Sequence, residues 1–319
     1  MMEGKRVIGN FKGRAACKIK ISLYVGLVFL LSLVSCSLYA DESSPTPTPN
    51  ALGKQVEQNQ SGKEHSWDMP GVITISKTVK PSLKEEERIG TAAQPRWTAV
   101  RRFPTTRVYV EAEGVSQFEY WMRPTVDRDG KFVKIRNQYE YEMGLPSRFQ
   151  LDLYLTTMKN GNTGSVYFEE LSWEVRYALA DWGMLPGNPT LYFEWITAGG
   201  DSDAFESKLL IGDELGSRWH WGVNGVFERK IGGDLGQEYA LTGGLSYTVI
   251  DMKLSLGAEV KASFEDTKDN RGTFEKTYLA GPSIQWRPLL AFHIDIAGLM
   301  GLTKDSPLTE PLIVAGWEF

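Results

Sequence analysis

The chain has 319 residues, of which 42% are hydrophobic and 12% aromatic, and its 40 acidic and 35 basic residues give a net charge of −5. This composition excludes a collagen, a disulfide-stapled miniprotein and a wholly disordered chain. The acidic balance argues against a nucleic-acid partner, because the phosphate backbone binds clustered Lys and Arg. One or two domains fit the length.

The first forty residues have the features of a signal peptide. A basic stretch over residues 1–20 precedes an apolar run, Ile21 to Val34, with small residues after it. Such a run, about 21 Å long as a helix, is too short for the roughly 30 Å hydrocarbon core of a bilayer, so we favour export over a membrane anchor. Cleavage is expected after Ala40. The alternative is cleavage before Cys36, because Leu33-Val34-Ser35-Cys36 resembles a bacterial lipobox, whose cysteine is lipidated.

Neither processing route leaves a cysteine pair. Cleavage after Ala40 removes both Cys17 and Cys36, and lipidation retains only Cys36. A disulfide and a thiol metal site are therefore excluded from the exported chain. Since His220 and His293 stand at unrelated positions, we expect no metal site and no cofactor.

Residues 41–106 are expected to form a flexible periplasmic tether. The alternation Ser44-Pro45-Thr46-Pro47-Thr48-Pro49 favours extended chain. Polar residues then continue through 55–62. This interpretation leaves residues 107–319 as the folded domain.

From residue 107 onward, apolar residues alternate with polar or small ones. Leu256 and Val260 share one face of a segment whose other face carries Glu259 and Lys261. A period of two predicts β-strands. Twelve strands are predicted, near 108–123, 133–143, 148–157, 166–179, 190–197, 204–212, 218–229, 238–248, 252–264, 275–286, 289–301 and 311–319.

Aromatic residues bracket the apolar faces of these segments. The pairs Trp219 and Phe227, and Tyr239 and Tyr247, are each eight residues apart. Eight tilted strand residues span roughly 20 Å, close to the ~25 Å apolar band between the aromatic girdles of membrane barrels. A soluble sandwich would bury its apolar faces instead. We therefore predict an all-β fold, an antiparallel up-and-down transmembrane β-barrel of about 12 strands.

The end of the chain carries a family resemblance. The terminal Phe319, with Trp317 and other apolar residues at alternate positions, is similar to the last strand of bacterial outer-membrane barrels. Together with the phrases at 141–151 and 279–284, it resembles an uncharacterised family of these barrels, and more distantly the phenol-degradation (MetA-pathway) transporter barrels. The resemblance implies a Gram-negative outer membrane, its lipids as surroundings, and recognition of Trp317 and Phe319 by the barrel-assembly machinery.

If apolar residues face lipid, the alternate residues face the lumen. The acidic residues on that face are Glu119, Glu140, Glu142, Asp152, Glu170, Glu174, Glu194, Glu206, Glu228, Glu238, Glu259 and Asp295. The basic ones are Arg123, Arg136, Arg176, Lys208, Lys253 and Lys261, and His293 joins them. An excess of acids attracts cations.

We therefore expect a channel or transporter for small solutes, with an acidic, weakly cation-favouring lumen. A structural or partner-binding barrel with a closed lumen is one alternative, because the charges could pair with one another. A lipid-modifying enzyme is another, because His293 lies two residues from Asp295 on the same face. No serine is placed beside a histidine by the sequence, so we lean against an enzyme and assign no catalytic residue.

Overall fold

The computed structural model describes residues 83–319. The expected signal peptide, the alternative lipidation site Cys36 and the tether up to residue 82 lie outside the described residues. None of the helices between residues 83 and 319 is long and apolar enough to cross a membrane.

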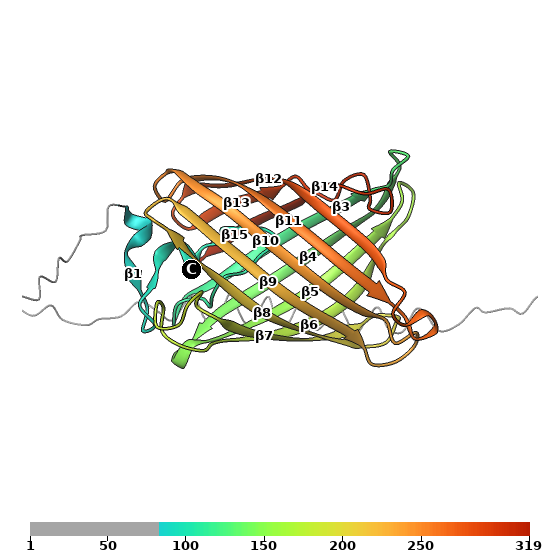
Figure 1. The fold of residues 1–319 in the computed structure, drawn as a ribbon, viewed down its shortest axis with the longest axis horizontal. Coiled ribbons are helices and arrows are strands. Elements are labelled where there is room, and N and C mark those ends of the chain that lie inside the picture. The colour runs from blue at the N-terminus through green and yellow to red at the C-terminus, as the bar shows by residue number, and fades with distance from the viewer. Residues whose placement is uncertain (1–82) are drawn as a thin grey trace, which may run out of the picture. The chain divides into compact units, whose positions relative to one another are not determined.

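Residues 116–319 form a closed antiparallel barrel of 12 strands, which confirms the predicted fold class (Figure 1). The last strand pairs with the first, so the sheet has no free edge. The strands are β3 (Ser116–Val126), β4 (Phe132–Leu145), β5 (Phe149–Asn160), β6 (Val166–Ala178), β7 (Thr190–Ala198), β8 (Ala204–Leu215), β9 (Trp219–Lys230), β10 (Gln237–Ile250), β11 (Leu254–Asp266), β12 (Glu275–Leu289), β13 with β14 (Phe292–Ala297 and Met300–Gly301) and β15 (Leu312–Glu318).

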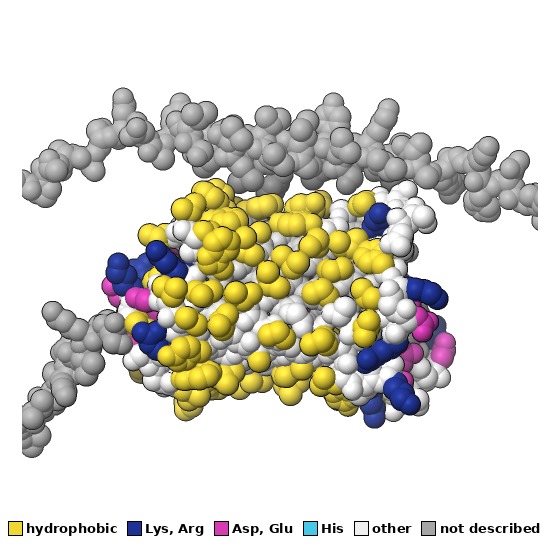
Figure 2. Space-filling model, turned by 90° about the horizontal axis from the view of Figure 1, so that it is seen from above, with side chains coloured by type: hydrophobic (Ala, Val, Ile, Leu, Met, Phe, Trp, Pro, Cys, Tyr) yellow, Lys and Arg dark blue, Asp and Glu magenta, His cyan; other side chains and the backbone are white. Residues whose placement is uncertain are grey.

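The wall of the barrel is apolar outside and polar inside. Val260 is 52% exposed on the outer side, whereas the preceding Glu259 is fully buried inside. Hydrophobic side chains cover the flank, and charged ones gather at the two ends (Figure 2). The ring centroids of Phe227 and Tyr239 lie 5.1 Å apart near one end, and those of Trp219 and Tyr247 lie 5.0 Å apart near the other. This distribution is the inverse of a soluble protein's and is typical of membrane barrels.

One strand of the barrel is interrupted. Pro282 in β12 lacks the N–H that would donate to its neighbour, and the facing strand breaks at 298–299, between β13 and β14. Gly298 N–H still donates to the Pro282 carbonyl over 2.9 Å. The register on the two sides of the break is unchanged, because Ser283 pairs with Ala297 and Ala280 with Met300.

Residues 83–115, which we call the plug, lie at the mouth of the barrel end that holds the C-terminus and extend from there into the barrel (Figure 1). The plug contains η1 (Lys84–Glu86), the paired β1 (Arg88–Ile89) and β2 (Gln94–Pro95), and η2 (Arg96–Ala99). Its anchors Trp97 and Phe103 are fully buried. A Cβ atom on Gly244 would lie 2.4 Å from the Phe103 ring, so the barrel wall needs glycine there.

The plug corrects two expectations. The flexible tether is wrong for residues 83–106, because apolar anchors and arginines of this segment are buried against the wall. The predicted strand at 108–123 is wrong in its first half, since β3 begins at Ser116. Polar and apolar residues alternate over 107–115 as they do in a strand. The backbone of this segment nevertheless forms hydrogen bonds with side chains of the barrel wall, since Arg107 N–H donates to Asn224 Oδ1 over 2.8 Å.

Candidate lumen site

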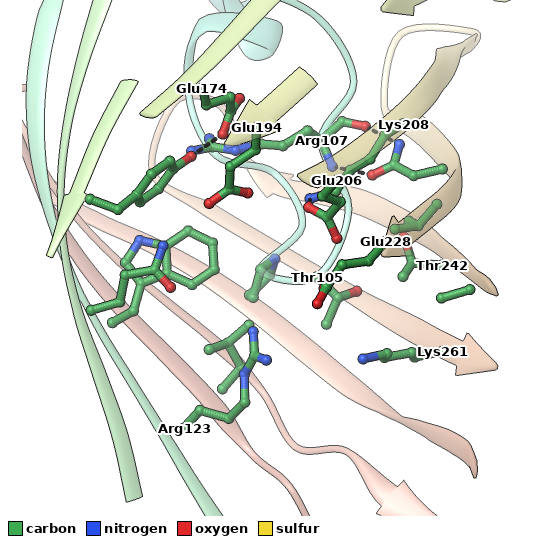
Figure 3. Close-up of a pocket in the computed structure, with 18 of the residues that line it drawn as sticks. Thr105, Arg107, Arg123, Glu174, Glu194, Glu206, Lys208, Glu228, Thr242 and Lys261 are labelled. Atoms are coloured by element: carbon green, nitrogen blue, oxygen red, sulfur yellow. Dashed lines mark hydrogen bonds and ion pairs between the residues drawn. The ribbon is translucent and has the colours of Figure 1, made fainter. Parts of the chain in front are cut away.

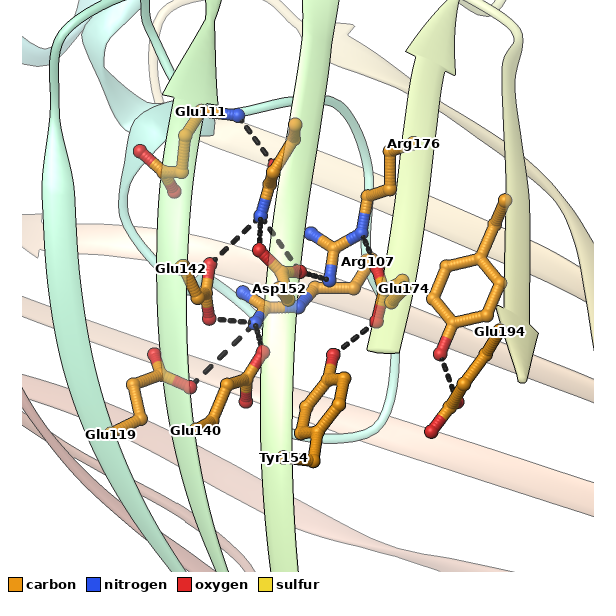
Figure 4. A network of polar contacts seen from close by, with 12 residues as sticks. Arg107, Glu111, Glu119, Glu140, Glu142, Asp152, Tyr154, Glu174, Arg176 and Glu194 are labelled. Carbon is orange, nitrogen blue, oxygen red and sulfur yellow. Dashed lines mark hydrogen bonds and ion pairs between the residues drawn. The ribbon is translucent and has the colours of Figure 1, made fainter. Parts of the chain in front are cut away.

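Two arginines of the plug meet three carboxylates of the wall, and Figure 4 shows one of them, Arg107, among these carboxylates. The Arg101 Nε–H donates to both oxygens of Glu119, over 3.0 and 2.9 Å, and its Nη2 lies 3.2 Å from Glu142 Oε1. Arg107 Nη2 lies 3.0 Å from Glu140 Oε1 and also donates to Glu142. The three glutamates are fully buried. Such charges are tolerated only when they are paired and hydrogen-bonded, so these contacts hold the plug in place.

An aromatic ring completes this site. The Arg101 guanidinium carbon lies 3.9 Å from the centroid of the Trp121 ring. The Trp121 Nε1–H donates to Glu119 Oε2 over 2.9 Å. We call Glu119, Trp121, Glu140 and Glu142 the arginine cage. Planar carboxylates and an aromatic face together match the shape and charge of a guanidinium group.

A second buried network continues from the cage towards β7. Arg176 Nη2 lies 2.9 Å from Asp152 Oδ2, and its Nε–H donates to Glu174 (Figure 4). Tyr154 also donates to Glu174, and the Tyr192 hydroxyl donates to Glu194 Oε2 over 2.5 Å. Two carboxylate groups, Glu119–Glu140–Glu142 and Glu140–Asp152–Glu174, bring oxygens within 4.8 Å of one another and have the geometry to hold a cation. Arginine guanidinium groups of this chain already supply positive charge to both carboxylate groups.

Carboxylates on neighbouring strands stand directly opposite one another from β4 to β12. This carboxylate ladder consists, in order, of Glu142, Asp152, Glu174, Glu194, Glu206, Glu228, Glu238, Glu265 and Glu275. It begins at the arginine cage and ends at the loops opposite the plug. Like charges in direct cross-strand pairs are destabilising, so the ladder requires cations. Lys208 lies 2.6 Å from Glu206, and Lys261 lies 3.5 Å from Glu238.

A cavity of about 380 Å³ lies inside the barrel against the plug (Figure 3). Its lining includes eight acidic and seven basic side chains, among them Arg101 and Arg107 of the plug. Glu228 and Glu238 line this cavity and also a smaller one, of about 180 Å³, that reaches Glu275 at the loops. The volume of the larger cavity falls within the roughly 300–1,000 Å³ of small-molecule sites. The ladder therefore passes from the loops through both cavities to the cage.

The structure places the residues expected in the lumen inside the wall, with one exception. Those buried against the plug or wall are Glu119, Glu140, Glu142, Asp152, Glu259, His293 and Asp295. Those lining the larger cavity are Arg123, Arg136, Glu170, Glu174, Arg176, Glu194, Glu206, Lys208, Glu228, Glu238 and Lys261. Lys253 is the exception: it lies exposed in the turn between β10 and β11, because its strand begins only at Leu254.

Sequence reasoning missed the plug's contributions to the lumen. Arg101, Arg102 and Arg107 were assigned no role. Arg102 donates to Glu85 over 2.9 Å and to Thr248 over 3.0 Å. The two-to-one excess of acids on the inward face was the signal, since buried acids on that scale need cations from elsewhere in the chain.

His293 lies between two carboxylates. Its Nδ1 lies 2.6 Å from Asp295 Oδ2, and its Nε2 lies 3.5 Å from Glu119 Oε1. A Cβ atom on Gly316 would lie 1.9 Å from Nε2, so the ring fills the space left by this glycine. In the described part of the chain, no serine hydroxyl forms a hydrogen bond with His293.

Two titratable groups of the plug are shifted by their surroundings. Burial raises the pKa of Tyr109 to about 12, and its hydroxyl donates to the Ala180 carbonyl over 2.6 Å. Burial, followed by the nearby Glu142 carboxylate, raises the pKa of Glu111 well above its ordinary value. Among the residues that the structure describes, none forms a hydrogen bond with Glu111 Oε2.

In the comparisons with known proteins, this chain is similar to solved structures alone. No family model matches the chain. No curated protein matches it. The chain is similar to the COG4313 outer membrane channel from Pseudomonas putida F1, with 12% identity and a TM-score of 0.44 over 66% of this chain and 98% of that one. It is also similar to the KdgM porin (9% identity, TM-score 0.45, 64% and 99% coverage) and the NanC porin (10%, 0.44, 64% and 98%). Likeness at this level carries no function to this chain.

Proposed function

We propose that this protein is an outer-membrane channel for small solutes, closed by its plug in the conformation described here. The observation that carries the proposal is the combination of an apolar outer flank with a charged cavity that ends at the plug. Twelve strands enclose a modest bore, between filled eight-stranded barrels and open 16-stranded porins. A segment that occupies only one end of such a bore leaves room for solutes at the other.

The lumen becomes selective for cations when the plug withdraws. With the plug in place, the acids and bases around the cavity nearly balance, and two of the bases belong to the plug. Withdrawal removes Arg101 and Arg107 and uncovers the acids of the arginine cage. A barrel with a permanently closed lumen is the second candidate, favoured by the buried ion pairs between plug and wall.

Planar-bilayer conductance of the refolded full chain tests the proposal. The variant Trp97→Ala/Phe103→Ala removes both buried anchors of the plug and is expected to give longer and more frequent stepwise currents than the parent. Lys84→Ala, an exposed plug position, is the matched control. Heat-modifiable migration on gels shows that each protein is folded. If every folded protein were silent, the channel would be refuted and the closed barrel favoured.

The last strand would also serve assembly in the outer membrane. Trp317 faces outward, 44% exposed, and its ring centroid lies 5.8 Å from that of Phe292. Phe319 is 73% exposed, and its N–H donates to the Ser116 carbonyl. Deletion of Phe319 is expected to lower the heat-modifiable fraction in outer membranes. An unchanged fraction would refute recognition of this residue by the assembly machinery.

A further inference from the structure

The arginine cage is built like a ligand site, with part of the chain as its ligand. The guanidinium of Arg101 stacks on Trp121, donates to both oxygens of Glu119 and reaches Glu142. Arg107 adds a second guanidinium, 6.0 Å from the same ring. An ammonium ion would use only part of this geometry, because it lacks a planar face and a fork of donors. The cage therefore selects guanidinium over ammonium.

Two residues beside the cage carry polar atoms that the plug does not hydrogen-bond. Gln117 and His293 are both fully buried beside Glu119. Gln117 donates to Glu119 over 3.1 Å, while its own Oε1 has no hydrogen-bond partner among residues 83–319. His293 Nε2, 3.5 Å from Glu119, likewise makes no hydrogen bond within the part of the chain that the structure describes. Buried polar atoms without partners are costly, and a ligand with several N–H donors would satisfy the Gln117 oxygen.

A soluble cation has a path to this site. Trp121 of the cage and both plug arginines, Arg101 and Arg107, line the 380 Å³ cavity, whereas the three cage glutamates are buried and do not line it. The floor of the cavity is therefore formed in part by the cage tryptophan and the two arginines bound in the cage. The carboxylate ladder leads from the loops to that floor. The Arg107 side chain is 13% exposed and the Arg101 side chain only 1%, so Arg107 is the arginine that a ligand in the cavity meets first.

We propose that the arginine cage binds soluble organic cations carrying a guanidinium group, which compete with Arg101 and Arg107 and so open the channel. This inference rests on the proposed function, since opening requires a channel. A ligand that binds only the undocked cage shifts the equilibrium away from the docked plug, by an amount set by its concentration and affinity.

The test adds millimolar agmatine, which carries a guanidinium group, to the loop side of bilayers containing the full-length protein. The control is putrescine at the same ionic strength, because it has the chain and charge of agmatine with an ammonium group in place of the guanidinium. Agmatine is expected to raise the open fraction several-fold, and putrescine to leave it unchanged. Arg107→Gln removes one tethered competitor and should lower the half-opening concentration of agmatine about tenfold, the size of one charged hydrogen bond. Arg107→Lys should shift it less.

Fluorescence gives a readout that does not depend on current. The Trp121 ring lies against Arg101, so the difference in emission between the parent and Trp121→Phe should change with agmatine over the same concentrations. If putrescine opened the channel equally, positive charge alone would account for opening and the inference would fail. If Trp97→Ala/Phe103→Ala conducted while agmatine changed neither current nor fluorescence, the channel would stand and the inference would fall. If none of the variants gave a current, both the proposed function and this inference would be refuted.

Discussion

The inward carboxylates are neutralised in different ways at the two ends of the lumen. At the plug end, Arg101 and Arg107 neutralise fully buried glutamates at short distances. At the loop end, the ladder continues through Glu228, Glu265 and Glu275, with Lys208 and Lys261 as its neighbouring cations. One end is a buried ion-pair network, and the other is an acidic lining with partly exposed ion pairs. We therefore expect an inward carboxylate to contribute to stability at one end and to ion attraction at the other.

The largest difference is expected between Glu142→Gln and Glu238→Gln. Glu142 contacts Arg101, Arg107 and Gln150 in a buried site, and its neutralisation leaves buried guanidinium charge without full compensation. We expect it to cost about 3–5 kcal/mol in the free energy of unfolding. Glu238 has one partly exposed ion pair, so its neutralisation should cost about 0–1 kcal/mol. Urea unfolding in lipid vesicles measures both, and equal losses would contradict the contrast between the two ends.

A disulfide between plug and wall should fix the plug end closed. The hydroxyls of Thr106 and Thr242 lie 3.0 Å apart and are buried. In a background without Cys17 and Cys36, Thr106→Cys/Thr242→Cys is expected to abolish conductance when oxidised and to restore it when reduced. The crosslink should add about 2–4 kcal/mol to the stability of the docked plug. Thr106→Cys alone is the control. Current through the oxidised double variant would show that solutes bypass the plug.

The alternation of residues from 116 onward was enough to predict the barrel, because lipid outside and water inside impose a period of two on every strand. It could not reveal the plug. Val108, Val110 and Ala112 alternate just as a strand does, but they are buried inside the barrel rather than exposed on its flank. The contacts that fold the plug join residues far apart in sequence, such as Thr105 with Glu259. The inward glutamates were identifiable one by one, whereas their pairing with Arg101 required the fold.

A pH dependence of plug docking should follow from Glu111. The groups facing it are Glu142, Arg107, Glu318 and Arg176, and its pKa is raised in the docked plug. The docked state therefore binds the proton more tightly than a released plug. This contribution favours docking below the ordinary pKa of 4.5 and is lost as the pH rises through the raised value.

Glu111→Gln removes that contribution, so its closed fraction should rise less on acidification than the parent's. Comparing the variant with the parent cancels the titration of the cage glutamates, which both proteins share. Glu113→Gln, an exposed plug position, serves as the control. Bilayer recordings at pH 5 and pH 8 give the closed fractions. A parent and Glu111→Gln with identical pH profiles would show that Glu111 does not report plug docking.

The smallest expected effect concerns ion selectivity at the loop end. In the Trp97→Ala/Phe103→Ala background, Glu228→Gln should lower the preference for cations, because it removes a negative charge from both cavities. Lys261→Gln should raise the preference, because it frees Glu238 of its ion pair. Charges lining a narrow passage act on mobile ions through the local potential, so the two reversal potentials in a salt gradient should move in opposite directions by a few millivolts. Both shifts should shrink at high salt, where the Debye length falls to about 3 Å at 1 M. Shifts of the same sign, or shifts that persist at 1 M salt, would mean that these substitutions change the shape of the passage and not its charge.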